Sequence, residues 1–101
     1  MATLNNSFVL PNEKLMMNAC KLAIVQDKRI MVDYWLESFA DPPTACIGQR
    51  ENGDRLLIKS GGAEYSSSIL KLYKVDNELL VVTENSIYLV SSNIESKRID
   101  N

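Results

Sequence analysis

The sequence predicts an α+β, mainly β domain, in which one N-terminal helix packs on a curled antiparallel sheet or small open barrel of about six strands. Three observations support this fold class. Apolar residues between positions 11 and 25 recur at helical spacings. An Asn-Gly pair separates two apolar β-type runs, and three more such runs follow from position 69, joined by short polar turns.

The composition indicates one ordinary globular domain. The chain has 101 residues, of which 46% are hydrophobic and 24% charged, so neither a disordered segment nor a fibrous repeat is expected. We expect a single domain over residues 1–101, with flexible segments at 1–9 and 93–101.

The first expected element is a helix that starts at Pro11 and ends near Val25. Pro11 suits a first helical turn, and Glu13 favours the positive end of the helix dipole. The apolar residues spaced by three and four are Leu15, Met16, Ala19, Cys20, Leu22 and Ala23. This pattern predicts one buried helix face.

A strand is expected next, from Arg29 to Leu36, before the stop at Asp41-Pro42-Pro43. Tyr34 and Trp35 are neighbours, so in a strand they point to opposite faces and only one of them joins the main core. The exposed one is a candidate anchor for a protein contact. The favoured arrangement places Trp35 in the core and Tyr34 at its rim, and Trp35 is kept as a candidate interface residue in case it is the exposed one.

A hairpin is expected around Asn52-Gly53, with strands over Thr44–Arg50 and Arg55–Ser60. In this arrangement Arg50 pairs with Arg55, and Cys46 pairs with Lys59. Three cations, Arg50, Arg55 and Lys59, would then lie along one face of the β-ribbon.

An antiparallel meander is expected over Ile69–Val75, Glu78–Thr83 and Ile87–Ser92. If Asp76-Asn77 is a two-residue loop, the register follows directly. The pairs would be Lys74 with Leu79, Leu72 with Val81 and Leu70 with Thr83.

Both faces of this meander are apolar, so both need a cover. Two coverings remain open: the helix closes the second face, or part of that face is an interface for a second copy or another protein. The candidate interface residues on this face are Tyr73, Leu80, Val82, Ile87 and Leu89, to which Trp35 is added.

Catalytic and metal-binding patterns are missing from the sequence. It contains no histidine, and its two cysteines, Cys20 and Cys46, form no CxxC pair. We therefore expect reduced, packed thiols in an intracellular, soluble protein, with no enzymatic activity, cofactor or metal. No apolar run is long enough to span a membrane.

The charge balance argues against a general attraction to nucleic acid, because 11 basic and 13 acidic residues give a net charge of −2. The favoured expectation is a non-enzymatic protein-interaction or assembly module that binds a partner or itself. The alternative is a small nucleic-acid-binding β-barrel that uses Arg50, Arg55 and Lys59.

Two segments, Asp27–Trp35 and Thr83–Val90, resemble small uncharacterised proteins of large DNA viruses of microbial eukaryotes. The resemblance includes no functional motif and transfers no site residue. It implies a minor virion component or a binder of a host protein.

Overall fold

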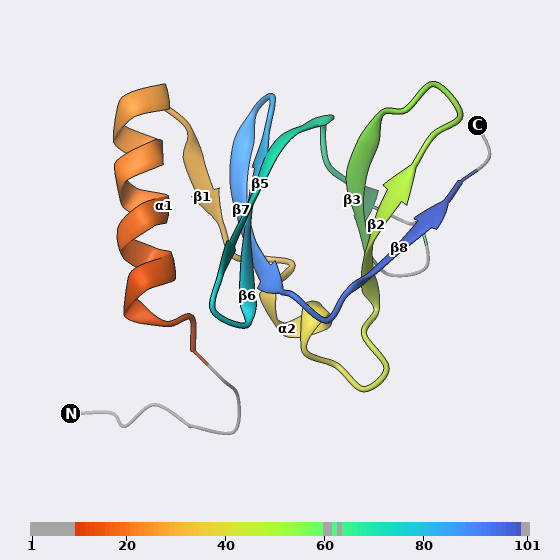
Figure 1. Ribbon diagram of the computed structural model, residues 1–101, viewed down its shortest axis with the longest axis horizontal. Coiled ribbons are helices and arrows are strands. Elements are labelled where there is room, and N and C mark those ends of the chain that lie inside the picture. The colour runs from red at the N-terminus through yellow and green to blue at the C-terminus, as the bar shows by residue number, and fades with distance from the viewer. Residues whose placement is uncertain (1–9, 60–61, 63, 100–101) are drawn as a thin grey trace.

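The computed structural model describes residues 10–59, 62 and 64–99, and it confirms the α+β, mainly β fold class (Figure 1). In chain order the elements are α1 (Glu13–Gln26), β1 (Arg29–Met31), α2 (Trp35–Ser38), β2 (Ala45–Gln49), β3 (Arg55–Lys59), β4 (Glu64–Tyr65), β5 (Ile69–Val75), β6 (Glu78–Thr83), β7 (Ser86–Ser91) and β8 (Glu95–Arg98). The strands form two sheets that do not close into a barrel.

The two sheets have four strands each. Sheet A has the order β1-β7-β6-β5, and sheet B has the order β4-β3-β2-β8. The pairs β1–β7 and β2–β8 are parallel, whereas the other pairs are antiparallel. The expectation of a single curled antiparallel sheet is therefore wrong, because two strands from the first half of the chain pair with strands near its end.

Helix α1, sheet A and sheet B are stacked as three layers (Figure 1). The helix-side core fills the space between α1 and sheet A, and its buried members are Leu15, Ala19, Trp35, Leu80, Val82, Ile87 and Leu89. The inter-sheet core fills the space between the sheets, and its buried members are Tyr34, Ala45, Ile47, Leu57, Val81, Val90 and Ile94. Sheet A is covered on both faces, as its two apolar faces require.

Helix α1 is confirmed and starts two residues after Pro11. Asn12 is the N-cap, and its side chain accepts a hydrogen bond of 2.8 Å from the Leu15 N–H. The Asn12 N–H in turn donates to Glu78 Oε1 at 3.1 Å, which fixes the start of the helix to sheet A. Asp27 ends the helix with a left-handed φ of 53°.

The expected strand from Arg29 to Leu36 is only three residues long. The chain leaves sheet A after Met31 and turns into α2, where the Trp35 N–H donates to the Val32 carbonyl at 3.1 Å. Tyr34 lies in the inter-sheet core and is 3% exposed, whereas Trp35 lies in the helix-side core and is 4% exposed. Neither ring is on the surface, because both faces of sheet A are covered.

The β2–β3 hairpin is confirmed, but its register differs from the expected one by one residue. Arg55 pairs with Gln49, and Lys59 pairs with Ala45. The reason is the loop: the Gly53 N–H donates to the Arg50 carbonyl, and Gly53 has a φ of +94°. This is typical of a type I turn followed by a left-handed glycine, not of a four-residue loop between paired arginines.

The β5–β6 register is confirmed for Lys74 with Leu79 and for Leu72 with Val81. A bulge between Ile69 and Lys71 gives Thr83 the partner Ile69 instead of the expected Leu70.

The segment 93–101, expected to be flexible, contains strand β8, which pairs with β2 over residues 95–98. The other segment expected to be flexible, 1–9, lies outside the described residues, as do positions 100 and 101.

Candidate functional site

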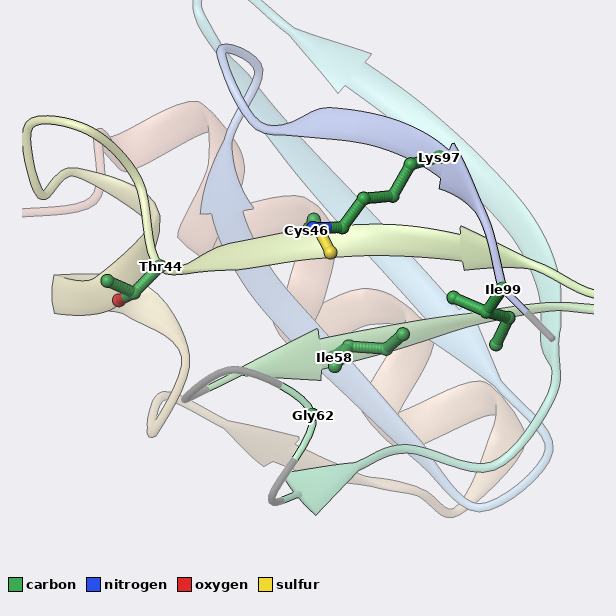
Figure 2. Close-up of a pocket in the computed structure, with 6 residues that line it drawn as sticks. All are labelled: Thr44, Cys46, Ile58, Gly62, Lys97 and Ile99. Atoms are coloured by element: carbon green, nitrogen blue, oxygen red, sulfur yellow. The ribbon is translucent and has the colours of Figure 1, made fainter. Parts of the chain in front are cut away.

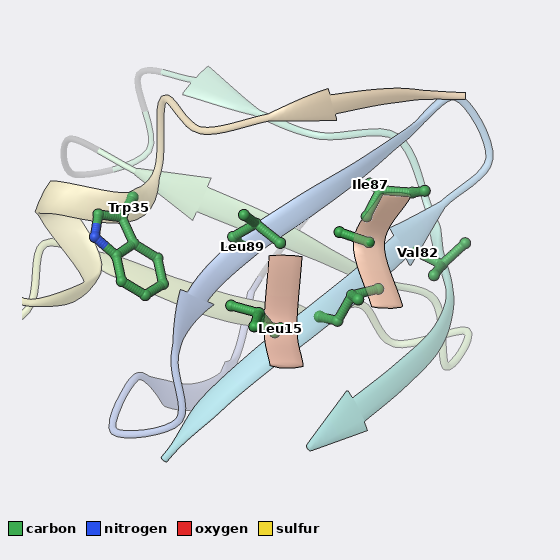
Figure 3. Close-up of a cluster of buried hydrophobic side chains, with 7 residues drawn as sticks. Leu15, Trp35, Val82, Ile87 and Leu89 are labelled. Carbon is green, nitrogen blue, oxygen red and sulfur yellow. The ribbon is translucent and has the colours of Figure 1, made fainter. Parts of the chain in front are cut away.

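The expected interface residues of the meander are covered by α1. Leu80, Ile87 and Leu89 are fully buried, and Val82 is 2% exposed. They pack against Leu15 and Ala19 from α1 in the helix-side core (Figure 3). Of the two open alternatives, the structure shows the closure by the helix, so these four residues cannot make contacts with another protein while α1 is in place.

The two remaining members of the expected interface are also constrained. Trp35 is buried in the helix-side core, where its ring lies 4.6 Å from that of Phe39. Tyr73 is 36% exposed and lies on a hollow of about 330 Å³ between α1 and the β5–β6 hairpin. The ammonium group of Lys71 lies over the Tyr73 ring at 5.4 Å. Tyr73 is thus the one residue of the expected interface that the structure leaves exposed, since the other five are buried.

Lys59, an expected nucleic-acid contact, is buried among acidic side chains. Its ammonium nitrogen lies 3.2 Å from Asp33 Oδ2, 3.4 Å from Glu64 Oε2 and 3.9 Å from Glu37 Oε2. It also lies 4.7 Å from the centre of the Tyr34 ring. The charge of Lys59 is compensated within the chain, so this lysine is not available to a phosphate.

The electrostatic environment stabilises the protonated forms of Lys59 and of two tyrosines. Burial alone would lower the pKa of Lys59, but the hydrogen bond and charge of Asp33, with Glu64, outweigh it, and the pKa is raised. Burial also raises the pKa of Tyr34 and of Tyr88, whose rings make an edge contact at 5.1 Å.

This cluster acts as a structural tie among α2, β3 and β4. The carboxylates surround an ammonium ion instead of an open position, and within residues 10–59, 62 and 64–99 no group of three acidic, cysteine or histidine residues is arranged to hold a metal.

Of the other two expected nucleic-acid contacts, Arg55 lies on the same face of β3 as Lys59, four residues before it, whereas Arg50 lies off that face. Arg55 lies opposite Gln49 at the start of β3. Arg50 lies in the loop, where its backbone N–H donates to the Asp54 carbonyl at 2.7 Å. Because the register differs by one residue, the expected row of three cations on one face of the ribbon is wrong.

A second hollow, of about 260 Å³, lies on the outer face of sheet B (Figure 2). Its lining consists of Thr44, Cys46, Ile58, Gly62, Lys97 and Ile99. Gly48 belongs to the same face, and a Cβ added there would overlap Ile58 Cδ1. Cys46 is a free, half-buried thiol in this lining.

The side of α1 that points away from sheet A also carries apolar side chains, which lie beside the exposed charged residues Glu13 and Lys21. We call Met17, Cys20, Ile24 and Val25 the outer face of α1. Met17 is 63%, Ile24 81% and Val25 80% exposed. Cys20 is an exposed free thiol, which corrects the expectation that it is buried. A shallow hollow of about 530 Å³ runs along this face from Glu13 to Ile24.

Sequence reasoning missed this outer face, although the signal was present. Leu15, Ala19 and Leu22 follow one another at spacings of four and three, and Met17, Cys20 and Ile24 do so at spacings of three and four. These are two separate stripes, and together they make the apolar arc of the helix wider than one buried face needs.

The free sheet edges, in contrast, carry charged side chains. Edge strand β5 has Lys71 and Lys74, and edge strand β8 has the four exposed residues Glu95–Arg98, three of which are charged. Such charges disfavour the addition of another strand. The outer face of α1 is therefore the better candidate for a contact with another protein.

Comparisons with known proteins identify no relative: no protein family, no curated protein and no solved structure matches this chain. Within the described part of the chain, neither helix combines the length and the apolar character needed to cross a membrane.

Proposed function

We propose that this chain is a non-enzymatic protein-interaction module that assembles through the outer face of α1. The observation that carries the proposal is the exposure of Met17, Ile24 and Val25, each more than 60% exposed on one helix. A group of apolar side chains that is this exposed, on a helix whose other side is buried, is typical of a surface that another protein covers.

The energetic gain from covering this face is substantial. Full burial of an Ile, Val or Met side chain contributes roughly 1.5–3 kcal/mol relative to its exposed state. Each of the three exposed side chains on one copy can add a gain of this size. The ordering of side chains and the loss of translational and rotational freedom on association oppose this gain.

The outer face is also presented rigidly, which lowers the entropic cost of binding. Leu15 and Ala19 on the opposite side of α1 are completely buried. The hydrogen bond from Asn12 to Glu78 fixes the start of the helix to β6. A partner therefore meets a preformed surface.

Under this proposal the module acts inside cells, and the resemblance to proteins of large DNA viruses would make it a minor virion component or a binder of a host protein. Nucleic acid is not proposed as a partner, because the ammonium group of Lys59 is held by Asp33 and Glu64.

The test is the solution mass by light scattering, over a wide range of protein concentrations and at low and high salt. We expect a dimer or larger species that persists at high salt, because burial of apolar surface is not screened by ions.

The matched variants are Ile24→Lys and Gln26→Lys, which add the same charge to exposed positions of α1. Only Ile24→Lys should reduce the mass, because Gln26 is outside the outer face. A wild-type chain that stays monomeric at every concentration, or an Ile24→Lys chain that assembles normally, would contradict the proposal.

A further inference from the structure

We infer that the hollow between α1 and β5 binds an acidic, extended segment of another protein, which adds to the free edge of β5. This surface is separate from the outer face of α1, so the inference goes beyond the proposed function and does not depend on it. Three features carry it: a hollow with a partly apolar lining, lysines around it that make no ion pair in the described part of the chain, and a sheet edge beside it.

The hollow forms because α1 does not extend over the whole of sheet A. The helix packs on β1, β6 and β7, whereas β5 forms the edge of the sheet. The apolar part of the lining comes from Leu22, Val75 and the fully buried Leu80. The volume of about 330 Å³ is at the lower end of the range for ligand-binding pockets. It therefore suits a single apolar side chain better than a large cofactor.

The charged groups around the hollow are basic. Lys21 of α1 belongs to its lining, and the ammonium group of Lys71 lies over the ring of Tyr73 at 5.4 Å. Lys74 follows Tyr73 on the same edge strand. Among the residues that the structure describes, the ion pairs are those of Lys59, so none of these three lysines has an acidic partner. The whole chain has a net charge of −2, so this positive charge is local and favours an anionic group here.

The edge of sheet A indicates that the anionic groups belong to a peptide. Strand β5 pairs with β6 on one side only, so an extended peptide can pair with its other side. The lysines of β5 disfavour a second lysine-bearing strand, but an acidic strand makes them attractive cross-strand partners. Lys71 and Lys74 lie about 10 Å apart along an extended strand. A peptide reaches both of them, whereas one small anion does not.

The alternation of side chains along β5 determines the sequence that the edge should prefer. Tyr73 and Lys71 pair with Leu80 and Val82 of the helix-side core, so both lie on the helix side of β5, and Lys74 lies on the other side. An antiparallel peptide then needs an acidic residue opposite Lys74, an apolar one opposite Tyr73 and an acidic one opposite Lys71. This order is met by Glu-Leu-Thr-Glu, whose leucine enters the hollow.

The test is the fluorescence anisotropy of a labelled peptide that contains Glu-Leu-Thr-Glu, titrated with the full chain. We expect binding that weakens as salt is added, because exposed ion pairs are screened. Peptides with Lys-Leu-Thr-Lys or Glu-Ser-Thr-Glu in its place should bind at least about tenfold more weakly. The first reverses the charges, and the second removes the apolar side chain.

The matched variants are Lys71→Glu and Lys97→Glu, which reverse the same charge on exposed strand residues. Lys71→Glu should raise the dissociation constant of the acidic peptide by about three- to thirty-fold, because an attraction becomes a repulsion. Lys97→Glu, in sheet B, should leave it nearly unchanged. Asn18→Trp fills the hollow from an exposed helix position and should remove the preference for leucine over serine. Circular dichroism checks that each variant is folded.

Four outcomes would overturn the inference. They are no measurable binding of the acidic peptide, equal binding of the lysine peptide, equal effects of Lys71→Glu and Lys97→Glu, and an Asn18→Trp chain that still prefers leucine. A single-stranded oligonucleotide that binds more tightly than the acidic peptide would also overturn it, because the lysines would then serve phosphates. None of these results bears on the outer face of α1, whose test is the solution mass.

Discussion

The two sides of α1 are built from similar residues but have opposite environments. On the inner side, Leu15 and Ala19 are completely buried against sheet A. On the outer side, Met17 and Ile24 are 63% and 81% exposed. The difference shows that apolar composition alone does not identify the core. The inner side stabilises the fold, and we propose that the outer side serves assembly.

The largest effect should come from the inner side. Leu15→Ala removes a fully buried side chain from the helix-side core. We expect the free energy of unfolding to fall by about 2–5 kcal/mol, measured by urea denaturation. Met17→Ala is the matched control on the outer side and should change it by less than about 0.5 kcal/mol. Equal losses for the two variants would remove the distinction between the sides.

A smaller decrease in the free energy of unfolding is expected from a substitution on the far side of sheet A, where Lys59 connects α2 to sheet B. Lys59→Met keeps the aliphatic length but leaves Asp33 and Glu64 without their cation. These carboxylates are 45% and 63% exposed, so water can solvate them. We expect a loss of about 1–2 kcal/mol in the same denaturation assay, below the cost for a fully buried pair. Lys97→Met, at an exposed lysine of β8, should be nearly neutral.

The helix period and the turns between antiparallel strands could be predicted because both are local signals. Spacings of three and four gave α1, and the two-residue turn at Asp76-Asn77 gave the pairing of Lys74 with Leu79. The parallel partners of β1 and β2 could not be predicted in this way. They lie more than 40 residues away, and no local spacing encodes a parallel pair.

The candidate site was predicted less well than the fold. Leu80 and Ile87 were correctly identified as part of a second apolar face, but whether α1 covers that face depends on tertiary packing. The exposed stripe on α1 was encoded locally, by Met17, Cys20 and Ile24. It was missed because the prediction assigned Cys20 to the buried face and did not consider Met17 and Ile24 as a second stripe.

An alkaline titration should distinguish the inter-sheet core from the helix-side core, because only the former contains tyrosine and the Lys59 tie. The pKa values of Tyr34, Tyr88 and Lys59 are raised in the folded chain. The unfolded chain therefore releases these protons first, and the free energy of unfolding falls as the pH rises above about 10.

The measurement is urea denaturation between about pH 9 and pH 11, compared with a Tyr34→Phe variant that keeps the ring. The variant should lose stability less steeply with pH, because one of the three proton releases is removed. Identical slopes would show that Tyr34 ionises equally in the folded and unfolded chains.

The smallest effect on stability should come from the outer side of α1. Ile24→Lys places a charge at a position that is 81% exposed, so we expect the free energy of unfolding to change by less than about 0.5 kcal/mol. Circular dichroism on thermal unfolding measures this at a protein concentration where wild type and variant are both monomeric. A large loss would mean that Ile24 supports the fold itself.

The parallel pairing of β1 with β7 has a consequence for protein synthesis. Residues 29–31 find their sheet partners only at residues 86–88. The inner side of α1 needs the same late strands, β6 and β7. At about 5–20 residues per second, a ribosome adds these strands roughly 3–12 seconds after it completes α1. During that time the inner side of the nascent helix lacks its partner strands, so we expect the growing chain to depend on chaperones until β7 is made.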